Sequence, residues 1–246
     1  MTVHYHGTPI TPRKVLYELA GHHFCVPYSD PRDVEVCHRI GQSVMIDNGA
    51  YTLWKRNRIQ DTPRSWEGFF YWVKPWLDYH TTWCVMPDVI DGTEEENDML
   101  VNQSIRALGG IRQAAPVWHL HESFTRLEML VVRFDKVCFG SSGEYAAVGS
   151  ESWNNRVNEA FNRICRGSGR PPAWIHMLRG MSLSGSVYPF ASVDSTDVAR
   201  NHEQVPGRAL KMAQRWDALQ CPATWIKQPI QTGLSHEFCN TGKDIS

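Results

Sequence analysis

The chain has 246 residues, of which 42% are hydrophobic and 21% charged, and its formal net charge is -1. This composition is that of an ordinary globular protein and excludes a disordered or fibrous chain. A charge near zero gives no sign of a polyanion-binding protein, so any basic patch has to be local. We expect a single domain over residues 1–246, with an irregular tail from about residue 222.

Short apolar runs alternate along the chain with stretches that predict helices. The runs are VHYH (3–6), HFCVP (23–27), SVMID (43–47), WCVMP (83–87), APVWH (115–119), KVCFG (136–140), AWIHM (173–177) and PFASV (189–193). This alternation is typical of a parallel α/β fold, and eight strands in about 250 residues are what a closed barrel needs. We therefore predict the α/β class and a single (β/α)₈ TIM barrel.

Start signals mark the helices between these runs. A capping-type residue before Pro predicts the first three starts, at Thr11-Pro12, Asp30-Pro31 and Thr62-Pro63. The later starts are predicted at Thr93, which three Glu follow, at Ser123, at Ser150 or Ser152, and at Ser195 or Thr196. The connection over residues 180–188 is rich in Gly and Ser and predicts a loop or a single turn.

The seven Cys lack the short spacings of a metal or disulfide framework, and several lie in the apolar runs. This pattern indicates the reduced thiols of a cytoplasmic protein. Cys221, His236 and Cys239 are loosely grouped, but their spacing fits no standard zinc template, and we expect neither a metal nor a cofactor. No leader-like segment and no apolar run of about 18 residues is found, so we expect no membrane association.

Side chains able to do chemistry collect at the predicted strand ends, where barrels of this kind build their active sites. These residues are His6, Tyr28, Asp47, Asp88, His119, His121, residues 140–143, His176 and Asp194. Carboxylates that face one pocket suit glycosidic-bond chemistry, in which one attacks or stabilises the sugar carbon and another moves a proton. A divalent ion held by the same Asp and His side chains is the competing use, so a metal-dependent hydrolase is an alternative.

Two of these carboxylates also have a purely structural interpretation. In VMIDNGAY (44–51), Asn-Gly between apolar runs is typical of a β-hairpin, although the WKRNR that follows argues against antiparallel pairing. In SVDST (192–196), Asp194 or Ser195 could cap the following helix.

Six segments in order are IDNGAY, MPDVID, PVWHLHE, CFGSSGE, HMLRG and FASVDST. Together they resemble the tRNA-guanine transglycosylase superfamily, and more closely its compact DpdA-like members from phages and bacterial DNA-modification clusters. The resemblance covers residues 43–200 and implies a glycosyltransferase of the pentosyltransferase, transglycosylase type. Such an enzyme replaces guanine in a nucleic acid with a 7-deazaguanine base such as preQ0. The resemblance makes Asp194 the nucleophile that attacks the sugar C1′ and Asp47 the general acid/base.

The resemblance also implies which residues bind the base. Tyr51 would stack on the base opposite Leu178, and Asp88 would read its Watson–Crick edge. His119 stands where the family carries a Gln that contacts the base carbonyl, and this departure leaves the identity of the base open. The remaining expected contacts are Gly140, Ser141, Ser142, Gly143 and His176.

The polymer substrate and the fate of the intermediate stay open. The zinc element of the tRNA enzymes, of the CxCxxC…H kind, has no match in the sequence, which favours DNA, or a free nucleoside or nucleotide, over tRNA as the partner. A base-excising DNA glycosylase or nucleoside hydrolase is an alternative, in which water replaces the incoming base. A non-catalytic binding barrel is another. Candidate phosphate contacts are Arg56, Arg58, Arg179 and Lys211.

Overall fold

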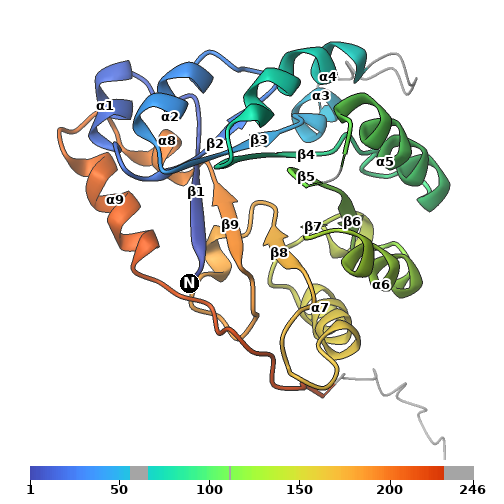
Figure 1. The fold of residues 1–246 in the computed structure, drawn as a ribbon. Coiled ribbons are helices and arrows are strands. Elements are labelled where there is room, and N and C mark those ends of the chain that lie inside the picture. The colour runs from blue at the N-terminus through green and yellow to red at the C-terminus, as the bar shows by residue number, and fades with distance from the viewer. Residues whose placement is uncertain (56–65, 111, 230–246) are drawn as a thin grey trace, which may run out of the picture.

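The computed structural model describes residues 1–55, 66–110 and 112–229. In these residues all strands are parallel and form one sheet, in the order β5-β4-β3-β2-β1-β9-β8-β7-β6 (Figure 1). The strands are β1 (Val3–Gly7), β2 (His23–Pro27), β3 (Ser43–Asp47), β4 (Thr82–Val85), β5 (Ala114–Ala115), β6 (Val117–His119), β7 (Lys136–Gly140), β8 (Trp174–Met177) and β9 (Ser192–Ser195).

The segment that carries β5 and β6 brings the two edges of the sheet together. β5 pairs with β4 on one side and β6 pairs with β7 on the other, and only Pro116 lies between them. Proline has no N–H to donate, which interrupts a strand, but the Pro116 carbonyl still accepts a bond from the Cys138 N–H at 2.9 Å. The predicted strand 115–119 is therefore one segment paired on both sides. The prediction of a single barrel of the (β/α)₈ type is confirmed.

Helices surround the strands on the outside (Figure 1). They are α1 (Arg13–Glu18), α2 (Val34–Ile40), α3 (Ala50–Lys55), α4 (Glu67–Val73), α5 (Glu94–Leu108), α6 (Phe124–Arg133), α7 (Glu151–Ile164), α8 (Asp197–Asn201) and α9 (Arg208–Asp217). Short 3₁₀ turns cover η2 (Lys74–Asp78), η3 (Gly143–Tyr145) and η4 (Met181–Leu183). The single turn expected in residues 180–188 is thus confirmed as η4.

The predicted helix starts hold where a side chain caps the helix. Thr93, Ser123 and Ser150 each accept a bond from a backbone N–H three residues on, and Thr93 forms a full capping box. The predicted start at Asp30 is wrong, because a turn comes first and α2 begins at Val34. The start predicted at Thr62-Pro63 lies outside the described residues.

Two predictions near the expected active site are corrected. The last strand is residues 192–195 rather than 189–193, so Asp194 lies within β9 and not after it. The register sets this boundary, because Ser192 pairs with the first residue of β1. The hairpin alternative after Asp47 is also wrong: Asn48 accepts from the Ala50 N–H through its side-chain oxygen, and α3 follows.

Apolar side chains pack in two layers because successive residues of a strand face opposite sides. The smaller layer fills the barrel interior, from Tyr5 on β1 to Cys138 on β7. The larger lies between the strands and the helices. The cysteines of the described residues are unpaired, and all but Cys221 are buried. No helix in the described residues is both long and apolar enough to cross a membrane, and residues 218–229 form neither helix nor strand.

The capping box of α5 gives a test of the fold. Replacing Thr93 with Ala removes the acceptor for the Glu96 N–H, and we expect the free energy of unfolding to fall by about 0.5–2 kcal/mol. Thr125→Ala is the matched control, because Thr125 is an exposed residue inside α6. Urea unfolding of both variants measures the difference, and equal stabilities would contradict the role of the cap.

Candidate active site

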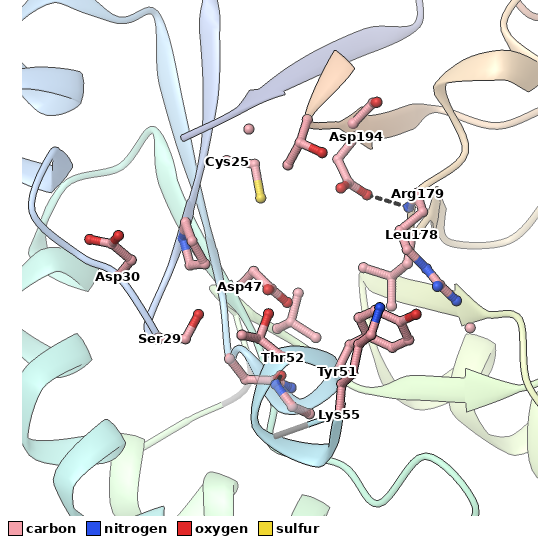
Figure 2. A pocket seen from close by; sticks show the side chains of 18 of the residues that line it. Cys25, Ser29, Asp30, Asp47, Tyr51, Thr52, Lys55, Leu178, Arg179 and Asp194 are labelled. Carbon is pink, nitrogen blue, oxygen red and sulfur yellow. Dashed lines mark hydrogen bonds between the residues drawn. The ribbon is translucent and has the colours of Figure 1, made fainter. Parts of the chain in front are cut away.

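A cavity of about 700 Å³ opens at the carboxyl ends of the strands (Figure 2). This volume is within the range of small-molecule sites, and the position is where barrels of this type bind substrates. Eight residues expected at the site from the sequence line it: Asp47, Tyr51, Asp88, His119, Gly140, Ser141, Leu178 and Asp194. The barrel therefore brings together residues that are up to 147 positions apart in the chain.

Asp47 is the last residue of β3, and its side chain reaches into the cavity. Burial raises the pKa of its carboxyl to about 7, and the negative charges of Asp194 and Asp88 act in the same direction. The Gly49 N–H and the charge of Arg179 oppose this shift in pKa. At neutral pH Asp47 therefore exists in both protonation states, as a general acid/base requires.

Asp194 extends from β9 and is held from two sides. The backbone N–H of Arg179 donates to its Oδ1 at 2.7 Å, and Nε2 of His176 lies 3.3 Å from the same oxygen (Figure 2). Arg179 has φ of 57°, in the left-handed region. The N-cap residue of α8 is Thr196, and the Asp197 N–H donates to Ser195 Oγ rather than to Asp194. The capping alternative therefore does not hold for Asp194.

Asp88, His119 and Asn48 form a buried group in the same cavity. The Asn48 side-chain amide donates to Asp88 Oδ1 at 2.7 Å, and Nε2 of His119 lies 2.9 Å from Asp88 Oδ2. Gly140 is required beside them, because a Cβ at that position would lie 2.9 Å from His119 Nδ1. The bond from Asn48 to Asp88 is not predicted from the sequence, where the available signal is a small polar residue directly after a strand-end Asp.

Tyr51 lies at the edge of the cavity on α3, where 42% of its surface is exposed. The Arg179 guanidinium lies over its ring, 4.4 Å from the centroid, and donates to the Ser141 carbonyl at 3.2 Å. Leu178 lines the cavity beside this pair (Figure 2). A flat ligand that stacks on Tyr51 therefore either uses the other face of the ring or displaces the guanidinium.

Three of the residues expected to bind the base do not line the cavity. Ser142 Oγ lies 2.7 Å from His121 Nδ1, and Gly143 begins η3. His176 is fully buried behind Asp194. His6 also departs from its expected place at the barrel mouth: Tyr5 fills the barrel interior, so the neighbouring side chain of His6 faces the outer side.

The positively charged side chains that line the cavity are only partly those expected to contact phosphate. Arg179 was expected and lines the cavity, and Lys55 and Arg200 line it in addition. Lys211 is not among the lining residues. Arg56 and Arg58 lie outside the described residues.

A metal-dependent hydrolase would need several His, Cys, Asp or Glu side chains close enough in the cavity to share an ion. Within the described residues, the one group of three or more His, Cys, Asp or Glu side chains close enough to share an ion is His6, His22 and Asp217. None of these three lines the cavity. The sequence signal near this group is the pair His4 and His6, two alternate residues of one strand.

Comparison with models of known protein families finds no match to this sequence, and comparison with curated proteins finds none either.

The raised pKa of Asp47 predicts a specific dependence of stability on pH. Between the ordinary value of 3.8 and about 7, the folded chain holds a proton that the unfolded chain has lost. The free energy of unfolding therefore falls as pH rises through this window, and the destabilisation is complete above it. Asp47→Asn removes this ionisation. We expect the variant to gain stability relative to the wild type, by a few kcal/mol, between about pH 5 and about pH 8.

Urea unfolding of both proteins across this range measures the difference. Asp135→Asn, on the exposed surface, controls for the loss of one negative charge. A stability difference between Asp47→Asn and the wild type that does not change with pH would contradict the assignment.

Proposed function

We propose that this protein is a base-exchanging transglycosylase that replaces guanine in DNA with a 7-deazaguanine base such as preQ0. The observation that supports the proposal most strongly is that Asp47 and Asp194 line one cavity while the pKa of Asp47 is raised to about 7. Base exchange needs one carboxylate that attacks carbon and another that gives and takes a proton. The resemblance of the lining motifs to the tRNA-guanine transglycosylase superfamily points to the same pair.

In the first half-reaction an oxygen of the Asp194 carboxylate attacks C1′ of the nucleotide. The bond between C1′ and the base nitrogen breaks, and its electron pair leaves with the base. The Asp47 carboxyl gives its proton to the departing base and becomes a carboxylate. The product is a glycosyl ester on Asp194, with the configuration at C1′ inverted.

In the second half-reaction the incoming 7-deazaguanine base gives a proton to Asp47 and attacks C1′ through its ring nitrogen. The ester bond breaks, and Asp194 leaves as a carboxylate. The second inversion restores the original configuration, as exchange within a polymer requires. Asp47 ends in the protonated state in which it began, and a pKa of about 7 suits both transfers.

Recognition of the base is assigned to Asp88, with His119 beside it. A carboxylate has about four acceptor positions, so Asp88 can bind Asn48 and still accept N–H donors from a guanine-type edge. The Asn48 amide fixes its orientation, and Nε2 of His119 lies 2.9 Å from its other oxygen. Tyr51 and Leu178 would hold the faces of the base, and stacking of this kind contributes about 1–3 kcal/mol per base.

DNA is the proposed polymer. Lys55, Arg179 and Arg200 place positive charge around a cavity that otherwise carries several carboxylates, which suits a phosphate backbone passing the rim. A paired base would have to leave the duplex to reach Asp194, so single-stranded or locally opened DNA is the favoured form. The missing zinc motif of the tRNA enzymes supports DNA over tRNA.

The nucleophile is tested by trapping the covalent intermediate. We expect intact-protein mass spectrometry, after incubation with guanine-containing DNA and denaturation, to find a glycosyl adduct on the wild type and none on Asp194→Asn. Asp30→Asn is the matched control, because Asp30 also lines the cavity and has no role in the proposed chemistry. An adduct on Asp194→Asn, or none on folded wild type with DNA, would contradict the proposal.

Adding preQ0 to the trapped intermediate separates exchange from excision. Exchange is expected to restore free enzyme and to place the new base in the DNA. Release of an abasic strand instead would identify a base-excising glycosylase. The same assay with tRNA and with free nucleosides identifies the polymer, and binding of DNA that Asp194→Asn leaves unchanged, with no adduct, would identify a binding barrel.

Asp88→Asn tests recognition of the base. The change replaces an acceptor with a donor beside Asn48, and we expect kcat/KM for guanine release to fall by about 10–100-fold, as for the loss of a paired base contact. Asp91→Asn, an exposed neighbour, is the control. A variant with wild-type kcat/KM would show that Asp88 does not read the base.

A further inference from the structure

A cluster of imidazoles lies on the outer side of the barrel, away from the cavity lining. His4 and His6 are alternate residues of β1, so their side chains share one face of the strand. Tyr5 between them fills the barrel interior, which places both imidazoles toward the helices. There they meet Asp217, the last residue of α9, a helix that lies beside β1, and His22, just before β2 (Figure 1).

The nitrogen atoms of these side chains converge on one carboxylate. Nδ1 of His22 lies 2.6 Å from Asp217 Oδ2, and Nε2 of His6 lies 3.2 Å from Asp217 Oδ1. Nδ1 of His4 lies 3.7 Å from that same Oδ1, beyond hydrogen-bond distance. The ligand atoms of His6, His22 and Asp217 all lie within 4.8 Å of one another.

These separations are close to those in a tetrahedral zinc site. Zinc bonds of about 2.0–2.2 Å to nitrogen and oxygen place the ligand atoms about 3.3–3.6 Å from one another. His6 matches this spacing to Asp217 within a few tenths of an ångström, and His22 would move outward by less than 1 Å. Two imidazole nitrogens with one carboxylate oxygen are a donor set that zinc accepts.

The surroundings orient the donors and leave an entry path. Nε2 of His4 lies 2.9 Å from Ser184 Oγ, which turns Nδ1 toward the cluster. The side chains of His4 and His6 are 1% and 0% exposed, whereas those of His22 and Asp217 are 14% and 30% exposed. An ion would therefore enter past His22 and Asp217 and come to rest against the two buried imidazoles.

We propose that His6, His22 and Asp217 bind one Zn²⁺, with the buried imidazole of His4 beside them. Three protein ligands leave the fourth position of a tetrahedral shell to a water molecule. The ion joins the first strand and the segment before β2 to the end of α9, which lies more than 190 residues further along the chain. The proposal is independent of the transglycosylase chemistry, since none of its ligands lines the cavity.

Metal content of the purified full chain tests the site. After EDTA treatment, dialysis and addition of ZnCl₂, we expect inductively coupled plasma mass spectrometry to find about one zinc per chain. Zinc is also expected to raise the Tm of the wild type, because it binds the folded state alone. His22→Gln keeps the fold, since His22 lies outside the strands and is partly exposed, and we expect at least about a tenfold loss of zinc affinity.

His80→Gln is the matched control, because His80 is an exposed histidine away from the cluster, and we expect it to retain wild-type zinc affinity. Asp217→Asn provides a second ligand change, with circular dichroism to check folding. Replacement of zinc by Co²⁺ adds a direct readout, since a tetrahedral site gives strong visible absorption bands. No zinc on folded wild type, or unchanged affinity in folded His22→Gln and Asp217→Asn, would overturn the proposal. Unchanged affinity in both variants would place the ion elsewhere.

Discussion

Successive side chains of a strand point to opposite faces of the sheet, and in this closed barrel that alternation decides which polar side chains face the interior and which face the helices. On β3, Met45 fills the barrel interior and Asp47, two residues on, reaches the cavity above it. On β1 the same alternation turns Tyr5 inward and leaves His4 and His6 on the outer side. A shift of one residue in either strand would exchange these faces. The pairing of Ser192 with the start of β1 is therefore also what brings Asp194 to the cavity.

Asp47, Asp88 and Asp194 are three of the four carboxylates that line that cavity, and their mutual repulsion has to be offset. Asp88 is bonded to the side-chain amide of Asn48, and Asp194 to the backbone amide of Arg179. For Asp47 the balance is different, because burial and its neighbours favour a retained proton. The barrel thus gives similar side chains different surroundings, at a cost in stability that the large apolar layers offset.

The sequence predicts most of the fold because apolar runs and caps are local signals. Runs such as 43–47 mark strands, and Thr93 with three following Glu marks a helix start. The sequence predicts which polar residues gather at the strand ends. It does not predict which side of a short strand faces inward, and His6 therefore lies on the outer side of the barrel rather than at its mouth. Nor does it encode locally the left-handed backbone of Arg179, which depends on contacts that distant elements make.

The backbone amide and the side chain of Arg179 make separate contacts in the cavity. Its backbone amide holds Asp194, while its guanidinium covers Tyr51 and reaches Ser141. Every amino acid except proline supplies that amide, so the side chain at this position can change during evolution without removing the bond that orients Asp194. Descendants of this barrel could therefore alter what lies over the aromatic ring, and with it the ligands admitted, while inheriting the same oriented carboxylate.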